Sequence, residues 1–356
     1  MQIYILLLFI LFTCVLIGFD NTKRKKIFMI IIFSILTLIA MLRSWKVGVD
    51  TEQYYRNFTV IANLGWDEVD VLRYESGYFY LCKILSCISK DPHILIIISS
   101  FIIIPSVGRF IYKYSSNVAL STFIYITLNI YFFHLTGMRQ SLAIAILLYG
   151  IDFLLERKNF KFMLIVIIAS LFHSSAVILI VLIWINKLKY GRKTYFNTIF
   201  TAIIGFIFYK PVFGIISQIL PKYQGYITST FGESNYFGAL LQFIVGLTVY
   251  TFCNKFYFFK DNEKQNNISR LALRCVSITV CLQAMTMRMN IIGRMSPYFW
   301  IFSIIAFPDA IKSIKSKNKS EWILIVLFVL FLYWLIIGIY RPEWNGVIPY
   351  YTLFRD

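Results

Sequence analysis

The segment Gly137-Met138-Arg139-Gln140 places an arginine and an amide between two long apolar runs, with no acidic residue close to it in the sequence. A guanidinium at the edge of a bilayer core costs several kcal/mol unless an anion or a wet cavity receives it. The best acceptors for its planar fork of donors are phosphate and carboxylate groups. Arg139 is therefore predicted to hold an anionic ligand where the hydrocarbon ends. The alternative is an interface anchor that snorkels to water.

Other side chains able to do chemistry stand at the ends of apolar runs on the face predicted for Arg139. They comprise cations, possible bases and hydrogen-bonding groups: Arg43, Lys46, Asp50, Tyr54, Glu75, Gln140, His173, Arg288 and Arg294. Several of these residues could instead have a purely structural role. His173 could brace a core, Asp50 could pair with Lys46, and Glu75 could pair with Arg73. Arg43 directly follows a helix, where snorkelling is ordinary.

The composition places these groups in a membrane protein. The 356-residue chain is 59% hydrophobic, and apolar runs of roughly 16 to 25 residues recur from end to end. Its net charge of +18 falls in short clusters between these runs. Such clusters are typical of topology signals rather than of a nucleic-acid surface. The six cysteines are scattered without a CxxC pair, which indicates neither a zinc site nor a disulfide framework.

Flanking charges predict how the first helices cross the membrane. The run from Gln2 to Phe19 lacks a basic start and a cleavage site, as a retained helix does. The cluster from Lys23 to Lys26 favours the cytoplasm, which puts the N-terminus outside. A second helix near 27–42 then delivers residues 43–90 to the outer face. This loop is rich in acidic and aromatic residues, and we expect it to lie on the membrane surface with an interfacial helix.

Residues 160–185 decide the topology of the second half. Basic residues flank both ends, among them Lys158 and Lys189. A hairpin keeps both flanks inside, whereas a single crossing would expose four close cations. Each arm has only about 11 to 13 residues, roughly 16 to 20 Å, which is too short for a full span of ~30 Å. The bend at Phe172-His173-Ser174-Ser175 is therefore predicted below the outer surface, beside protein or water.

The remaining runs lie near 94–112, 118–135, 141–155, 195–209, 236–253, 271–287, 297–311 and 322–340. The sequence thus predicts an all-α, polytopic transmembrane helical bundle of about 12 membrane segments, counting both hairpin arms. Residues 1–356 are expected to form a single integral-membrane domain, and the C-terminus is expected outside.

Several short elements occur in a recognisable order along the chain. They are Arg43 with Gly48-Val49-Asp50 and Tyr54; Glu75 with Tyr78; Met138-Arg139-Gln140-Ser141-Leu142-Ala143; Phe172-His173-Ser174-Ser175-Ala176; Arg294 with Tyr298-Phe299; and Pro349-Tyr350. As an ensemble they resemble the EpsG-like branch of the Wzy-type polysaccharide polymerases.

The resemblance implies a glycosyltransferase of the bacterial inner (plasma) membrane with a glycosyltransferase-C/Wzy-like fold. Such enzymes join polyprenyl-pyrophosphate-linked oligosaccharide units on the outer face, for exopolysaccharide, capsule or O-antigen. A sugar pyrophosphate carries its own leaving group, so the protein needs cations to hold it and a base for the incoming hydroxyl. The expected binding residues are Arg139, Gln140, Arg288, Arg294, Arg43 and Tyr54. The candidate bases are His173, Asp50 and Glu75.

Besides the lipid-linked oligosaccharide and the bilayer, a chain-length regulator is a candidate partner. We expect no metal and no cofactor, because cations outnumber the outer acidic residues and ligand spacing such as DxD is missing. A flippase or transporter of the same lipid-linked sugars is the main alternative. It predicts polar residues near the midplane and two-fold repetition, whereas the polar groups here cluster at one face. An acyltransferase with His173 as base would need an acyl-donor motif, which the sequence does not show.

Overall fold

The computed structural model describes residues 1–18, 22–72, 74–219, 236–257, 263–314 and 318–354. About 80% of the chain is helical and the described residues form no strand, which confirms the all-α class. The chain divides into two compact units. Unit 1 comprises Met1–Val177 and Ile323–Asp356, and unit 2 comprises Ile178–Trp322. That the whole chain acts as one integral-membrane domain stays a prediction.

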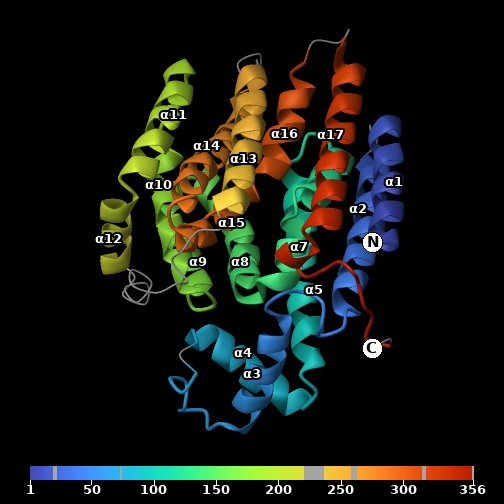
Figure 1. The fold of residues 1–356 in the computed structure, drawn as a ribbon, viewed down its shortest axis with the longest axis vertical. Helices are drawn as coiled ribbons and strands as arrows, with labels where there is room; N and C mark the ends of the chain where they lie inside the picture. Colours follow the sequence, from blue (N-terminus) through green and yellow to red (C-terminus); the bar gives the residue numbers. More distant parts are fainter. Residues whose placement is uncertain (19–21, 73, 220–235, 258–262, 315–317, 355–356) are drawn as a thin grey trace. The chain divides into compact units, whose positions relative to one another are not determined.

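In unit 1, α5 packs against α2 and α8, α8 packs against α9, and α1 packs against α6 (Figure 1). The helices of this unit are α1 (Gln2–Ile17), α2 (Thr22–Met41), α3 (Thr51–Asn63), α4 (Ser76–Ile88), α5 (His93–Tyr114), α6 (Val118–Thr127), α7 (Ile130–Thr136), α8 (Met138–Leu155), α9 (Asn159–Ser170), most of α17 (Lys319–Tyr340) and η6 (Pro342–Trp344). The 3-10 helix η1 (Ser174–Val181) leads from unit 1 into unit 2.

In unit 2, α14 is the central helix and packs against α11, α13 and α16. The helices of this unit are α10 (Leu182–Ile185), α11 (Arg192–Ile207), α12 (Tyr209–Ile219), α13 (Tyr236–Tyr257), α14 (Glu263–Thr286), η4 (Asn290–Met295), α15 (Pro297–Trp300) and α16 (Ser303–Lys312). Aromatic packing ties α13 to α16, since the rings of Phe252 and Phe307 stack with centroids 4.8 Å apart.

By length and composition, five of the described helices could cross a membrane, and up to eight spans result if each bent helix pair counts as one. The five are His93–Tyr114, Met138–Leu155, Tyr236–Phe256, Asn267–Thr286 and Lys319–Tyr340. The predicted count of about 12 is not confirmed. Several predicted segments fall short in length: α1, α9 and the 174–185 segment are apolar but have only 10–17 residues.

Two predicted helical runs are interrupted. The 118–135 run bends by 56° between α6 and α7, where Asn129 adopts a left-handed conformation with φ of 61°. Asparagine tolerates this conformation better than most residues do. The 160–185 run leaves the α-helix at Leu171 and resumes as a 3-10 helix at Ser174, which places a break at the predicted bend. That the two arms fold back as a hairpin stays a prediction.

Distant segments meet at one end of unit 1, here called the loop end, formed by residues 41–50, 75–77, 136–139, 171–174 and 345–353. The tail reaches the first loop through hydrogen bonds from Gly48 N to Gly346 O and from Leu353 N to Leu42 O, both 2.8 Å. It reaches the end of α7 through Thr136 Oγ1, which donates to Asn345 O at 2.9 Å.

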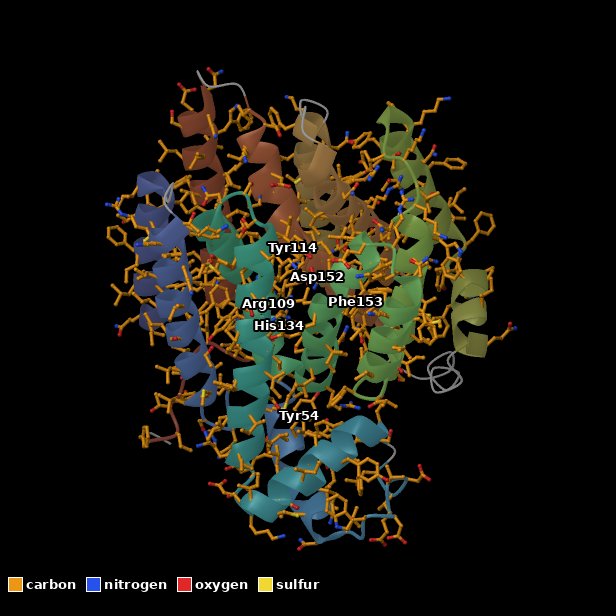
Figure 2. The ribbon with its side chains drawn as sticks, turned by 180° about the vertical axis from the view of Figure 1, so that it is seen from behind. Tyr54, Arg109, Tyr114, His134, Asp152 and Phe153 are labelled. Carbon is orange, nitrogen blue, oxygen red and sulfur yellow. The ribbon has the colours of Figure 1, made fainter. Side chains whose placement is uncertain are left out.

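The other end of α8 carries a different charge cluster (Figure 2). Asp152 accepts from Arg109 at 2.9 Å and from Lys113 at 2.6 Å. The Tyr114 hydroxyl also donates to Asp152. Because α8 runs from Met138 to Leu155, this cluster and the loop end lie at opposite ends of the helix.

The loop end predicts a labelling pattern that tests the topology. Cysteines placed one at a time at Lys46 in the loop end and at Phe354, which directly follows it, should react from outside intact cells with a membrane-impermeant maleimide, because both positions are exposed. Cysteines at Lys158 and Lys189 should be protected, because both basic flanks are expected inside. All four variants, in a cysteine-free background, should label after permeabilisation. Labelling of position 189 from outside would rule out the hairpin.

Candidate functional site

Glu75 connects three segments of the loop end. It directly precedes α4 with an extended backbone, and its side chain is only 7% exposed. Its Oε2 accepts from Arg139 Nη1 at 2.6 Å. Its Oε1 accepts from the backbone N and the Oγ of Ser174, at 3.2 and 3.1 Å. The N-terminal end of a helix also favours a negative charge. One carboxylate therefore holds the starts of α4, α8 and η1 together.

Arg139 lies in the first turn of α8, with its side chain 20% exposed. The sequence shows no acidic residue near it, and the structure corrects this, because Glu75 approaches from a different segment. The guanidinium carbon lies 4.4 Å from the ring centroid of Tyr74, 5.9 Å from that of Tyr54 and 5.8 Å from that of Tyr78. Such distances permit cation–π attraction.

The donors of Arg139 are only partly used. Within the described part of the chain, its buried Nε has no hydrogen-bond partner. A buried donor without an acceptor costs free energy unless a ligand or water supplies one. Arg139 is thus held by Glu75 and three rings, and its buried Nε is left without an acceptor.

The tyrosines around Arg139 supply neutral hydroxyl groups. Burial raises the pKa of Tyr54 and of Tyr74 above the usual value for tyrosine. Both hydroxyls therefore keep their protons at physiological pH and can donate to a phosphate oxygen. Asp50 lies close enough to influence both rings electrostatically. The structure thus places Tyr54 beside Arg139, and the part that Asp50 plays in the site stays a prediction.

His173 lies at the break between α9 and η1. Its Nδ1 is 3.9 Å from Glu75 Oε1, and its side chain is 13% exposed. This separation is too long for a hydrogen bond but short enough for an ion pair if the ring is protonated. Two backbone hydrogen bonds fix the break: His173 N donates to Ala169 O at 3.1 Å, and Gly77 N donates to Leu171 O at 2.8 Å. The first turn of α4 therefore positions the histidine.

Arg43 belongs to the loop end, but the structure favours a bracing role over the predicted binding role. Its side chain is 1% exposed. The guanidinium donates to Ala40 O, to Ser100 Oγ at 2.9 Å and to Leu135 O at 3.2 Å. Burial lowers the pKa of Arg43 to about 10, so the group stays cationic at neutral pH. It is enclosed by protein acceptors rather than directed at a ligand.

The remaining predicted residues are divided between the units. Gln140 is buried in α8 next to Arg139, and Lys46 is exposed with its ammonium over the Trp45 ring. Arg288 and Arg294 are exposed residues of unit 2. Their roles in binding stay predictions. Arg73 lies outside the described residues.

Sequence reasoning missed three residues of the cluster. Ser174 and Gly77 stand inside or next to quoted elements, yet neither received a role. Tyr74 has the shortest ring contact with Arg139. Its hydroxyl also accepts from Asn57. The only sequence signal for Tyr74 and Gly77 is that they flank the Glu75-Ser76 pair.

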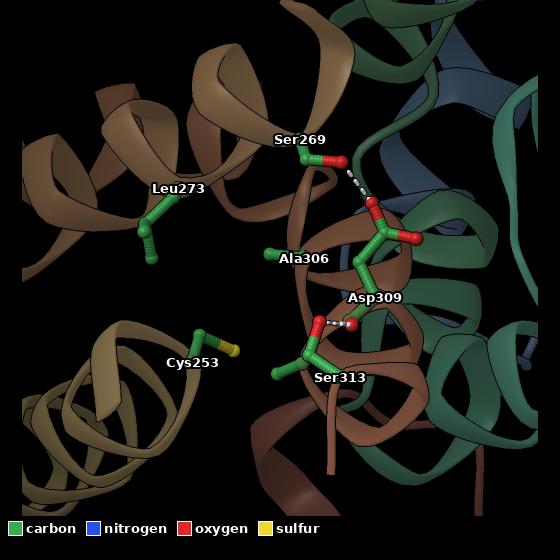
Figure 3. A pocket seen from close by; sticks show the side chains of 7 residues that line it. Cys253, Ser269, Leu273, Ala306, Asp309 and Ser313 are labelled. Carbon is green, nitrogen blue, oxygen red and sulfur yellow. Dashed lines mark hydrogen bonds between the residues drawn. The ribbon is translucent and has the colours of Figure 1, made fainter. Parts of the chain in front are cut away.

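A small cavity in unit 2 is separate from the elements of this cluster (Figure 3). Ser269 donates to the buried Asp309 carboxylate, and Ser313 Oγ donates to Asp309 O at 3.0 Å. The space suits about one water molecule, which is too little for a sugar. Over the described ranges, no group of three or more His, Cys, Asp and Glu residues could hold a metal ion.

A family model described as the EpsG family matches residues 26–352. This chain belongs to the EpsG family. The match confirms the resemblance seen in the sequence, and it contains Glu75, Arg139, His173 and the other predicted site residues. No curated protein and no solved structure matches the chain. As an EpsG-family member with several helices able to cross a bilayer, it is a multi-pass membrane protein.

The contact between Gly77 and Leu171 predicts a stability effect. A Cβ on Gly77 would lie 2.8 Å from Leu171 O and 2.9 Å from Leu171 Cβ. Gly77→Ala should therefore push the bend away from α4, at a cost of about 1 to 3 kcal/mol, and lower the melting temperature in detergent. Gly214→Ala is the matched control, because a Cβ there meets nothing within 4 Å. Equal melting temperatures for the two variants would contradict the contact.

Proposed function

We propose that this EpsG-family protein is a membrane glycosyltransferase of the Wzy polymerase type. It would join polyprenyl-pyrophosphate-linked oligosaccharide units into polysaccharide on the outer face of the membrane. The main support for the proposal is the cluster at the loop end, where Glu75 holds Arg139 close to His173. The family match supports the same function.

In this proposal Arg139 binds the pyrophosphate of the growing chain. Its fork can contact two phosphate oxygens at once, and the neutral hydroxyls of Tyr54 and Tyr74 are close enough to add donors. The leaving pyrophosphate gains negative charge as its bond to the sugar breaks. A fixed cation in a partly buried site stabilises that charge without reorganisation of water.

His173 is the preferred base. A hydroxyl oxygen of the incoming lipid-linked unit forms a bond to the anomeric carbon of the growing chain, and the bond from that carbon to the pyrophosphate oxygen breaks. The hydroxyl proton passes to the imidazole, and polyprenyl pyrophosphate leaves with the bonding electron pair. Asp50 is the second candidate for the base because it lies near Tyr54 and Tyr74. Glu75 is less suitable, since its oxygens already accept three hydrogen bonds.

Cells that lack the protein test the function against the flippase alternative. A polymerase predicts that single repeat units accumulate on lipid at the outer face and that longer chains disappear. Gel analysis of extracted polysaccharide, with enzymatic access from outside, would detect this. Retention of the single units on the inner face would instead favour a flippase.

The anion-binding role of Arg139 predicts a specific failure of lysine. Lysine keeps the charge but loses the bidentate fork. Arg139→Lys should therefore impair polymer formation nearly as much as Arg139→Ala when each variant complements the deletion strain at equal protein level. Arg56→Lys is a control, because Arg56 pairs with Glu52 at an exposed site. Normal polysaccharide chain lengths with Arg139→Lys would mean that the bidentate fork is not needed and that Arg139 serves only as a charge or an interface anchor.

The base role of His173 predicts a loss of rate rather than of folding. A general base contributes ~10² to 10⁴-fold to rate. His173→Gln keeps a hydrogen-bonding side chain but cannot accept a proton at neutral pH, so turnover should fall at least about a hundredfold with an unchanged melting temperature. Asp50→Asn and Glu75→Gln should be measured beside it. Near-normal turnover with earlier melting would make His173 a structural brace.

A further inference from the structure

Glu75 accepts a hydrogen bond from Arg139, the residue that would bind the pyrophosphate. Its Oε2 lies 2.6 Å from Arg139 Nη1, and the carboxylate is nearly buried. A pyrophosphate that approached Arg139 would meet this carboxylate at close range. Two anions in a poorly solvated site repel strongly, and the repulsion would grow as the leaving group gains charge. The resting arrangement therefore has to change when the donor substrate binds.

The geometry gives the carboxylate a second cation within reach. Oε1 lies 3.9 Å from His173 Nδ1, and the two hydrogen bonds from Ser174 hold that oxygen on the histidine side. The hydrogen bond from Arg139 Nη1 ends on Oε2. Release of Oε2 therefore needs a rotation of the side chain about an anchored oxygen, with no movement of α4 or α8.

The charges of the reaction match this movement. At rest the negative Glu75 offsets the positive Arg139. When the pyrophosphate binds Arg139 in place of Glu75, the carboxylate loses its partner. When His173 accepts the hydroxyl proton, it becomes a cation that needs an anion at Nδ1. A carboxylate that moves from Arg139 to His173 satisfies both requirements, and it holds the ring so that Nε2 faces the acceptor hydroxyl.

We propose that Glu75 is a positioning residue that exchanges partners: it blocks Arg139 until the donor pyrophosphate displaces it, and it then pairs with the protonated His173. This inference rests on the proposed function. It assigns Glu75 a role other than that of a base. Binding of the donor pyrophosphate would free the carboxylate to pair with His173 when the histidine accepts a proton. The carboxylate lowers affinity for the donor and raises the rate of transfer.

The test compares affinity with turnover in the purified full-length protein. Farnesyl pyrophosphate serves as the binding probe in titration calorimetry, and the lipid-linked repeat unit serves as the substrate. Glu75→Gln should bind the probe about tenfold more tightly than the wild type, which corresponds to about 1.4 kcal/mol, while kcat falls at least tenfold. Glu52→Gln, at the exposed pair with Arg56, should change neither quantity.

Glu75→Asp provides a second measurement if the glutamine variant does not fold. The shorter side chain withdraws the carboxylate from Arg139, so probe affinity should rise by a smaller factor. If the wild type binds the probe and the folded Glu75 variant binds it no more tightly, the partner exchange would be overturned. The proposed role of Arg139 would stand. Absence of probe binding in the wild type, or full binding in Arg139→Gln, would instead overturn the proposed role of Arg139.

Discussion

The ion pair between Glu75 and Arg139 is the interaction on which the loop end of unit 1 depends. Each charge offsets the cost of the other, because an unpaired charge at the edge of an apolar bundle is unfavourable. Together they bring the start of α4 to the start of α8. The second oxygen of the carboxylate fastens the turn after α9 through Ser174. The position of His173 follows from this attachment.

A comparison of Arg139 with Arg43 sets the proposed binding residue beside an arginine enclosed by protein acceptors. Both arginines lie at the loop end, and both are more buried than a surface cation. The Nη1 and Nη2 groups of Arg43 donate to two carbonyl oxygens and a serine, and its side chain is enclosed at 1% exposure. Arg139 has the Glu75 carboxylate as partner, neutral hydroxyls beside it and 20% of its side chain exposed. The second arrangement is the one that the proposed exchange of partner requires.

Much of this structure could be predicted from hydrophobic runs and flanking residues. The boundaries of α5, α8 and α17 lie within a few residues of the predicted ones, because long apolar runs define them. The break at His173 was predictable from the length of its run and its basic flanks. The break at Asn129 was not, since an asparagine within an apolar run seldom ends a helix. The predicted count of spans is not confirmed, because several apolar helices among the described residues are too short to count as spans.

The site was predictable as a set of residues but not as a set of contacts. The local sequence around Arg139 contains no acid, and the pairing with Glu75 depends on how α4 docks against the bend at Leu171. Tyr74 and Ser174 have ordinary residue types, and only their place next to Glu75 and His173 gives them a role. Contacts between residues this far apart in the sequence could be identified only from the three-dimensional structure.

The most direct test of the proposed function is turnover by the purified protein in liposomes that contain the isolated lipid-linked repeat unit. The account predicts a ladder of chains that lengthen by whole repeat units, with one polyprenyl pyrophosphate released for each unit added, and neither product with Arg139→Ala. Transfer of intact units across the bilayer without chain growth or pyrophosphate release would contradict it.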